Sequence, residues 1–433
     1  MTLRSIVSKD TTADSFKASY IPLQNIEFSH NQILFDGIFD DYFNMFPAYA
    51  GTGIETLQTV RLSELQVDEV GSVEGASGYL TFDLEALGRN YEALSDLAGP
   101  GGAAAVVKAD AYGLGAERVA KAVYERGCRH FFVAQFVEAT ELRPALPQDA
   151  QVFVLNGLQP GNEDICAYED IVPVINSIDQ WRNWARTARR LGRRLPAAVQ
   201  FDTGMSRLGL PPEERSQLVK EIALGDNVEI LFLLSHLASA DDGESVQNLE
   251  QLETFRAIAD EFPGYKLSFA NSGGILLGRP YRLGLARPGI ALYGGAYADD
   301  MHPMEPVVRL DVAVVQTRTV PAGAKIGYGG IHVASRETRL ATIAAGYADG
   351  LPRSLGDRGA VYFEGVRLPI VGRVSMDSIT IDISALPLGR IRLGSLVEVL
   401  GPNQTLEDVA RDAWTISYEI LTGLGHRYHR QYR

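Results

Sequence analysis

Cysteine is scarce in this chain of 433 residues, which contains only Cys128 and Cys166. Two cysteines cannot build a disulfide framework, and their spacing matches no metal-ligand pattern. We therefore expect no metal site and reduced thiols, as in the cytoplasm.

Long apolar runs are also missing. No run reaches the length that spans a membrane, and residues 1–5 lack the apolar core of a signal peptide. Basic residues are fewer than acidic ones, so the net charge is -14 and the pI is near 5.1. Nucleic-acid binding would need a basic face. We therefore expect a cytoplasmic protein that binds neither membranes nor nucleic acids.

What is present is ordinary for a soluble globular protein, with 46% hydrophobic and 22% charged residues. The length suggests two or three domains. Residues 1–77 hold eleven acidic residues against four basic ones and show no chemistry, so we interpret them as an acidic, partly ordered extension. The remainder divides by pattern into residues 78–305 and 306–433.

Short apolar runs alternate with helical patterns in residues 78–305. The runs span residues 79–83, 105–107, 130–134, 151–155, 171–175, 197–201, 228–235, 267–269 and 285–287. This alternation indicates parallel βαβ units, and about eight repeats predict a (β/α)₈ barrel with its site at the carboxyl ends of the strands. After residue 305 the predicted strands are separated by turn residues, which indicates a mainly β C-terminal domain.

The segment 105–115 organises the chain. A buried strand ends at Lys108, a glycine-rich turn follows, and a helix is predicted over 117–126. Burying the charge of a lysine is costly, so a lysine at a strand end usually has a partner or a function. Taken alone, such a lysine is most often structural. At a barrel mouth it is also suited to a Schiff base with an aldehyde, either a substrate or pyridoxal phosphate.

Pyridoxal phosphate makes demands that later strand ends could meet. Backbone N–H groups and hydroxyls would bind its phosphate, cations would face its pyridine nitrogen and phenolic oxygen, and an aromatic side chain could stack on its ring. The candidates are Ser272, Gly289, Ile290, Arg287, Arg207 and His236. Each also has a plain interpretation: the arginines as ion pairs, the histidine as structural, and 271–272 as a helix cap.

Eight motifs together resemble the alanine racemase family. They lie at residues 107–115, 202–209, 235–241, 270–272, 287–294, 346–350, 371–377 and 418–419, in the order that the family has. The resemblance covers about residues 79–430. It implies a fold-type III pyridoxal-phosphate enzyme with a barrel, a β domain and a head-to-tail homodimer that shares its active sites.

The resemblance also implies roles for individual residues. Lys108 would bind the cofactor and act as the base on one face of the substrate Cα, and the partner subunit's Tyr347 would act on the other face. The phosphate ligands would be Tyr112, Ser272, Gly289, Ile290 and Tyr418. Arg287 would face the pyridine nitrogen and leave it unprotonated, because arginine barely gives up a proton.

Three further residues have implied roles near the substrate. His236 would lie near the cofactor ring and influence Tyr347, and Arg207 would contact the phenolic oxygen and the substrate carboxylate. The partner subunit's Met376 would add a backbone N–H to that carboxylate. Racemisation needs a base on each side of one carbon, which agrees with a lysine and a tyrosine as the pair.

Three positions depart from the family pattern. Asp110 and Leu114 stand where many relatives have Asn and His, and we expect both to be tolerated. Gln200 stands where some relatives carry a carbamylated lysine that positions the equivalent of Arg207. A glutamine cannot form a carbamate, so we expect its amide or a chloride ion to replace that group.

The first hypothesis is therefore an alanine racemase that supplies D-alanine for peptidoglycan. A racemase for a larger amino acid, such as serine or lysine, or one of broad specificity remains open, and so does a non-catalytic pyridoxal-phosphate-binding protein. Related decarboxylases share the fold, but the segments of Tyr347 and Arg287 argue against them. The sequence does not separate a biosynthetic from a catabolic role.

Overall fold

The computed structural model describes residues 76–223, 225, 227–295 and 304–433. The chain divides into two units, residues 1–68 and 69–433, and every described residue belongs to the second. The predicted acidic extension lies outside the described residues except for residues 76 and 77. No helix among the described residues is both long and apolar enough to cross a membrane.

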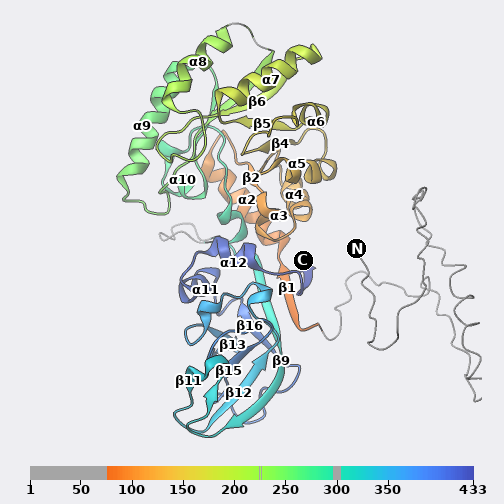
Figure 1. The fold of residues 1–433 in the computed structure, drawn as a ribbon, viewed down its shortest axis with the longest axis vertical. Helices are drawn as coiled ribbons and strands as arrows, with labels where there is room; N and C mark the ends of the chain where they lie inside the picture. Colours follow the sequence, from red (N-terminus) through yellow and green to blue (C-terminus); the bar gives the residue numbers. More distant parts are fainter. Residues whose placement is uncertain (1–75, 224, 226, 296–303) are drawn as a thin grey trace, which may run out of the picture. The chain divides into compact units, whose positions relative to one another are not determined.

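A parallel sheet forms the first part of the described chain (Figure 1). Its strands follow chain order: β2 (Ala105–Val106), β3 (His130–Val133), β4 (Gln151–Val154), β5 (Val172–Ile175), β6 (Leu195–Gln200), β7 (Val228–Leu234) and β8 (Lys266–Ser268). The segment 285–288 closes the ring, because Ala104 N donates to Ala286 O at 2.8 Å and Arg287 N donates to Ala270 O at 2.8 Å. The predicted α/β barrel is confirmed.

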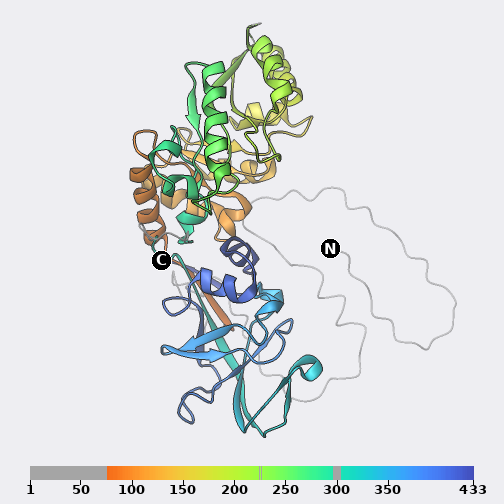
Figure 2. The ribbon, with the colours of Figure 1, turned by 90° about the vertical axis from the view of Figure 1, so that its left-hand side faces the viewer.

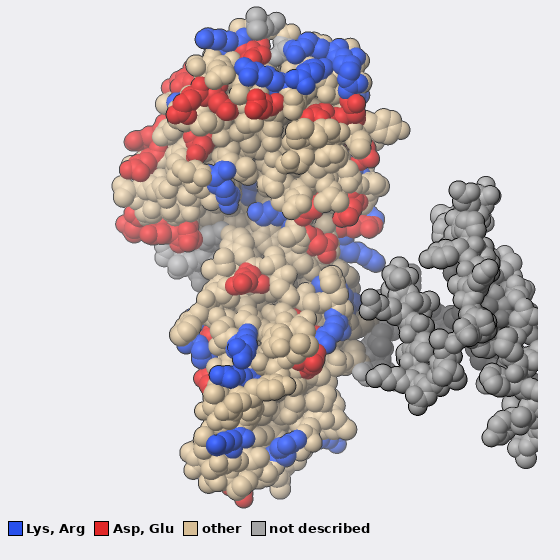
Figure 3. All heavy atoms as spheres, viewed as in Figure 1, with Lys and Arg blue, Asp and Glu red and all other residues tan. Residues whose placement is uncertain are grey.

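Helices lie outside this ring of strands (Figures 1 and 2). They are α2 (Leu84–Ala98), α3 (Lys108–Tyr112), α4 (Ala116–Glu125), α5 (Phe136–Leu142), α6 (Glu163–Tyr168), α7 (Ile178–Leu191), α8 (Pro212–Ala223), α9 (Val246–Glu261) and α10 (Ser272–Leu276). Helix α7 shows how the sequence achieves this. Trp181 and Trp184, three residues apart, are almost fully buried, whereas its arginines face solvent and give the basic area over α7 in Figure 3.

Aromatic rings pack against one another in the middle of the barrel. The ring of Phe153 lies 4.7 Å from that of Phe132 and 5.2 Å from that of Phe232, measured between centroids. All three residues are buried. The interior of this barrel is therefore a packed core, as is usual for the fold.

The C-terminal domain is mainly β, as predicted. Its eight-stranded sheet contains β1 (Gly78–Phe82), β9 (Val308–Val320), β12 (Thr338–Ile343), β13 (Ala360–Phe363), β14 (Val366–Pro369), β15 (Ile379–Asp382), β16 (Leu396–Leu400) and β17 (His429–Tyr432). A separate hairpin pairs β10 (Lys325–Ile326) with β11 (His332–Val333), and two helices complete the domain, α11 (Leu406–Ala413) and α12 (Ser417–Gly423).

Strand β1 belongs to this C-terminal sheet. It runs antiparallel to β9 and parallel to β17, although the sequence groups its residues with the barrel. A strand followed by a helix has the same local pattern whichever sheet it joins. Its partners lie more than two hundred residues away, so no local signal identifies them.

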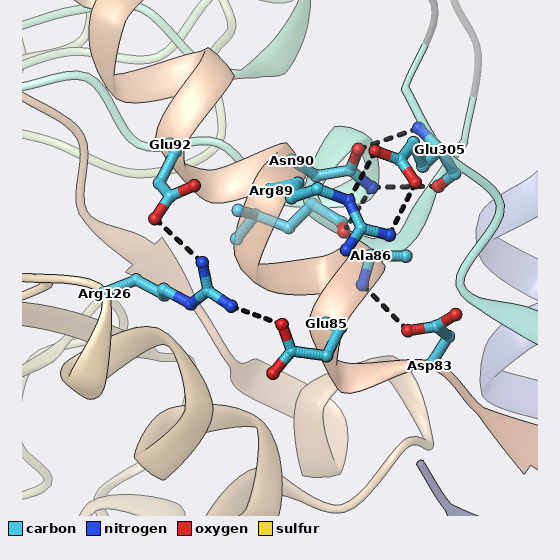
Figure 4. Close-up of polar contacts among 9 residues, drawn as sticks. Asp83, Glu85, Ala86, Arg89, Asn90, Glu92, Arg126 and Glu305 are labelled. Carbon is cyan, nitrogen blue, oxygen red and sulfur yellow. Dashed lines mark hydrogen bonds and ion pairs between the residues drawn. The ribbon is translucent and has the colours of Figure 1, made fainter.

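The start of helix α2 is bonded to Glu305, at the boundary between the barrel and the β domain (Figure 4). Asp83 caps the helix by accepting a hydrogen bond from Ala86 N at 2.8 Å. The buried Asn90 accepts from Glu305 N at 2.7 Å and donates to Glu305 O at 2.9 Å. Arg89 adds a bidentate ion pair with the carboxylate of Glu305, at 2.7 Å for each contact.

Candidate active site

Lys108 begins a turn with an unusual backbone. It is the first residue of α3, and only Val107 separates it from the end of β2. The four residues that follow, 109–112, all have φ between 53° and 57°. A non-glycine residue in this left-handed conformation costs about 1–2 kcal/mol. Strain of this kind persists only where the surroundings enforce it, and such places are often functional sites.

Neighbours on the barrel side hold this turn. Glu138 accepts from Ala109 N at 2.5 Å through one carboxylate oxygen, and from Ala134 N at 2.8 Å through the other. Asp110 accepts from Ala116 N at 2.7 Å, at the start of α4. A carboxylate is favourable at a helix N-terminus, so the departure from Asn at position 110 has a structural function.

The C-terminal strand holds the other end of the turn. Arg430 donates to Gly113 O at 2.6 Å, and Tyr432 donates its hydroxyl to Leu114 O at 2.8 Å. Leu114 itself is fully buried, which explains why an apolar residue is accepted there. The conformation of the lysine turn thus depends on residues of the barrel and on residues of the C-terminal strand.

The ammonium group of Lys108 is destabilised. Burial lowers the pKa of Lys108, the positive charge of Arg207 lowers it further, and Glu138 acts in the opposite direction. A lysine with a lowered pKa is more often neutral, and a neutral amine is the nucleophilic form.

Ser272 and Gly289 form a small polar cradle beside the turn. Ser272 is the first residue of α10, and its Oγ accepts from Gly289 N at 2.9 Å and from Ala291 N at 3.3 Å. A Cβ atom at Gly289 would lie 2.3 Å from the Tyr112 hydroxyl, so only glycine fits. Asn271, not Ser272, caps the helix.

Two pockets lie around Lys108 and the cradle. One, of about 290 Å³, is lined by Lys108, Tyr112 and Tyr418. The other, of about 620 Å³, is lined by His236 and Ile290 and shares Tyr418 with the first. The rings of Tyr112 and Tyr418 lie 5.9 Å apart. The structure therefore brings together predicted residues from four separate strand ends and from the β domain.

Arg287 is buried, with an exposed fraction of 3%. It donates to Ser268 Oγ at 2.5 Å and to Ser235 O at 2.6 Å, and it forms no ion pair with any described residue. Burial lowers its pKa to about 10, so it stays charged near neutral pH. A buried cation held only by neutral groups is costly, which indicates a function for its charge.

His236 is neutral at physiological pH. Burial lowers its pKa to about 3, and the charges of Arg287, Arg207 and Lys108 act in the same direction. Its backbone carbonyl accepts from Gln251 Nε2 at 2.9 Å. A neutral imidazole can lie against an aromatic ring or share a hydrogen bond without adding charge.

Arg207 lies on an exposed loop after β6. Asp202 Oδ1 organises this loop by accepting from Gly204 N at 2.9 Å and from Met205 N at 3.0 Å. Arg207 forms no ion pair within the described part of the chain, although its charge affects both Lys108 and His236. Gln200 is buried at the end of β6, and what it does for Arg207 stays a prediction.

Two predicted residues do not join this cluster. Tyr347 and Met376 lie in the β domain with exposed fractions of 45% and 52%, and neither lines the two pockets. Their backbones are tied together, because Tyr347 N donates to Ser375 O and Ala348 N donates to Met376 O, each at 3.0 Å. Side chains that serve a second subunit would be exposed in this way.

Sequence reasoning missed Arg427. Its guanidinium donates to both carboxylate oxygens of Asp349, at 2.6 and 2.7 Å, and to Asp377 at 2.6 Å. Asp349 in turn accepts from Gly346 N at 2.9 Å. Arg427 thus joins the turn of Tyr347 to the turn of Met376. An acidic residue inside each motif was the only signal in the sequence.

Tyr328 was also missed. It lies on a 3-10 turn, Tyr328–Gly330, at the tip of the β10–β11 hairpin, and it is 70% exposed. A Cβ atom at Gly329 would lie 3.1 Å from a guanidinium nitrogen of Arg373, so a cation lies beside this turn. A tyrosine between glycines at a hairpin tip is a signal that sequence reasoning could have used.

Family models cover most of the described chain. The model described as the N-terminal domain of alanine racemase matches residues 82–297, and the model described as the C-terminal domain of alanine racemase matches residues 307–432. The two matches together include every predicted site residue.

Individual relatives agree with the family models. The chain is 71% identical to a protein of Rhizobium johnstonii named "Alanine racemase, catabolic", over 83% of this chain and 96% of that one. It is 53% identical to an alanine racemase of Brucella canis, over 82% and 94% of the two chains. The crystal structure of alanine racemase from Bartonella henselae with covalently bound pyridoxal phosphate matches with a TM-score of 0.80 and 43% identity, over 83% of this chain and 100% of that one.

Proposed function

We propose, on the premise that this chain belongs to the alanine racemase family, that it interconverts L-alanine and D-alanine with pyridoxal 5'-phosphate bound at Lys108. One observation carries the proposal. A lysine with a lowered pKa lines a pocket together with Tyr112, whose hydroxyl lies against the cradle of Ser272 and Gly289.

The residues present fit the cofactor. A Cβ at Gly289 would fill the cradle beside Tyr112, as expected where a phosphate must approach the backbone. Ser272 and Tyr418 would add hydroxyl groups, and Ile290 a backbone N–H. When bound, the cofactor would withdraw electrons from the substrate and make the proton on its Cα removable.

The protein residues supply the bases and the orientation. Lys108 would take or return a proton on one face of the substrate Cα, because burial and the charge of Arg207 lower its pKa and so favour the free amine. Arg207 is exposed at the mouth and would bind the substrate carboxylate. The neutral His236 and the charged Arg287 would orient the cofactor ring.

The opposite base would come from a second copy of the chain. This needs a homodimer with shared sites, and the exposure of Tyr347 and Met376 supports it. The partner subunit's Tyr347 is the predicted base, and the partner subunit's Met376 would add a backbone N–H to the substrate carboxylate. Tyr328 competes with Tyr347 for this role, since it is more exposed and has Arg373 beside it.

Isotope exchange tests the reaction. The holoenzyme is incubated in D₂O with L-alanine, D-alanine, serine or lysine, and deuterium uptake and chirality at Cα are followed. Racemised, deuterated alanine with slower exchange of the other amino acids is the expected result. Faster exchange of serine or lysine would establish a racemase of different specificity. No exchange with bound cofactor would favour a non-catalytic binding protein.

The physiological role is a separate question. Peptidoglycan supply was the first hypothesis, but the name of the Rhizobium johnstonii relative favours breakdown of alanine. The two free, buried cysteines support a reducing compartment, so we place the reaction in the cytoplasm. Deleting the gene separates the roles: a requirement for external D-alanine indicates supply, and loss of growth on alanine as carbon source indicates breakdown.

A further inference from the structure

A third pocket lies at the end of the barrel opposite Lys108. It has a volume of about 510 Å³, and its polar lining comes from His130, Gln151 and Lys266. These are the first residues of β3, β4 and β8, whereas Lys108 follows the last residue of β2. The packed rings of Phe132, Phe153 and Phe232 lie between the two ends of the barrel.

The side chains of His130 and Gln151 lie on the inward face of their strands, and Lys266, which is exposed, adds to the lining of the pocket. Side chains alternate along a strand, so His130 shares the inward face of Phe132, and Gln151 that of Phe153. The ring of His130 stacks on Phe153 with centroids 6.0 Å apart. In a filled barrel this inward layer usually consists of bulky branched residues. Here it is polar and borders a cavity.

The chemistry of the pocket is that of a site for an anion with an apolar body. Lys266 is its one charged group, and no acidic residue lines it. Burial and the charge of Lys266 lower the pKa of His130, so its imidazole is neutral. Within the described residues, His130, Gln151 and Lys266 form no side-chain hydrogen bond or ion pair with the protein. Phe232 and three leucines supply the apolar wall.

Glycines form the rim at the seam where the barrel closes. A Cβ atom at Gly101 would lie 2.1 Å from Gly284 O, and one at Gly284 would lie 2.1 Å from Leu267 O. A side chain at either position would collide with the backbone, so both positions require glycine.

We propose that this lower pocket binds a small carboxylate with an aromatic or branched aliphatic body. Lys266 would pair with the carboxylate, the amide of Gln151 and the imidazole of His130 would donate hydrogen bonds, and the ring of Phe232 would contact the apolar body. A single cation matches a monoanion better than a doubly charged phosphate ester. The proposal is independent of the reaction at Lys108.

The pocket borders segments that also carry residues of the candidate active site at Lys108. Lys266 lies two residues before Ser268, Leu285 lies two residues before Arg287, and Ser268 Oγ accepts a hydrogen bond from Arg287. A ligand that joins these segments at their lower ends would stabilise the seam. We therefore expect it to raise the melting temperature of the holoenzyme.

Phenylacetate is a suitable probe, titrated into the holoenzyme by calorimetry with and without saturating alanine. We expect a Kd on the order of 1 mM for a ligand of this size, unchanged by alanine. Lys266→Gln should weaken binding by about tenfold or more, since it removes a charged hydrogen-bond partner. Lys220→Gln, on the exposed face of α8, is the matched control and should bind as the unmodified protein does.

Neutral and cationic analogues complete the design. Phenylacetamide should bind more weakly than phenylacetate, and 2-phenylethylamine should bind least. Competition by alanine would place the carboxylate near Arg207 and overturn the proposal. Equal affinity of Lys266→Gln and the unmodified holoenzyme would overturn it too, as would no binding of phenylacetate at all.

Discussion

The barrel and the β domain carry predicted site residues in opposite states. Lys108, Ser272 and Arg287 on the barrel are wholly or partly buried, and Ser272 and Arg287 form hydrogen bonds with other residues of the barrel. Tyr347 and Met376 on the β domain are exposed, while the turns that carry them are fixed by Arg427. The difference indicates that the barrel residues form their part of the proposed site within a single chain. The residues on the β domain are placed to contact a second chain.

Removing the amine of the barrel part should have the largest effect. We expect Lys108→Ala to lower kcat by at least about 10³-fold, because a nucleophile and a base are lost together. Lys121→Ala is the control, since Lys121 is exposed and pairs only with Glu117 one helical turn away. Racemisation rate and cofactor absorbance are the measurements. Near-normal activity of Lys108→Ala would remove the barrel from the chemistry.

Tyr347→Phe should cost about 10²- to 10⁴-fold in kcat if its phenol is the opposite base. Mixing it with Lys108→Ala tests whether the site is shared. Random reassociation of the two inactive chains would restore about a quarter of full activity, since half the dimers are mixed and each has one intact site. No recovery after confirmed mixing would contradict a shared site.

The same mixture with Tyr328→Phe decides between the two tyrosines. The variant that loses the larger factor in kcat, and regains it on mixing with Lys108→Ala, is the base. The other tyrosine should keep kcat within a small factor. Equal losses in both would mean that the hairpin tip and the turn of Tyr347 act as one surface.

Arg427 should show an intermediate effect, because it acts through the positions of other groups. Arg427→Lys keeps the charge but loses the bidentate contact with Asp349, so the turns of Tyr347 and Met376 should shift. Misplacement by about 1 Å can cost roughly 10²-fold, and we expect about 10- to 100-fold in kcat/KM. Arg390→Lys, at the exposed pair with Glu364, should leave kcat/KM unchanged.

The sequence predicts the site residues on the barrel better than the contacts that fix the exposed site residues on the β domain, and the reason is physical. Residues such as Lys108 and Arg287 stand at strand ends, where a local apolar run places them. Arg427 acts on Asp349, 78 residues away, and no local pattern encodes that contact. The left-handed turn after Lys108 was not predicted either, because Glu138 and Arg430 impose it from distant parts of the chain.

His236 gives a smaller, pH-dependent test of the barrel part. Because its pKa in the folded state is about 3, its imidazole should not titrate between pH 8 and pH 5 in NMR spectra. The unfolded chain takes up this proton near pH 6.5, so the contribution of His236 to stability is lost as pH falls from about 6.5 towards 3. A titration near pH 6.5 would contradict the buried, cation-rich surroundings.

The junction between the two regions should affect stability and leave catalysis unchanged. Asn90 is buried and bonds to both the N–H and the carbonyl of Glu305, so Asn90→Ala should lower the free energy of unfolding by about 1–3 kcal/mol. Arg89→Ala removes only an exposed ion pair with the same residue and should have little effect. Thermal unfolding and kcat of both variants are the measurements. A fall in kcat for Asn90→Ala would mean that the alignment of the barrel and the β domain also positions the catalytic residues. The site residues on the barrel would then not be complete without the β domain of the same chain.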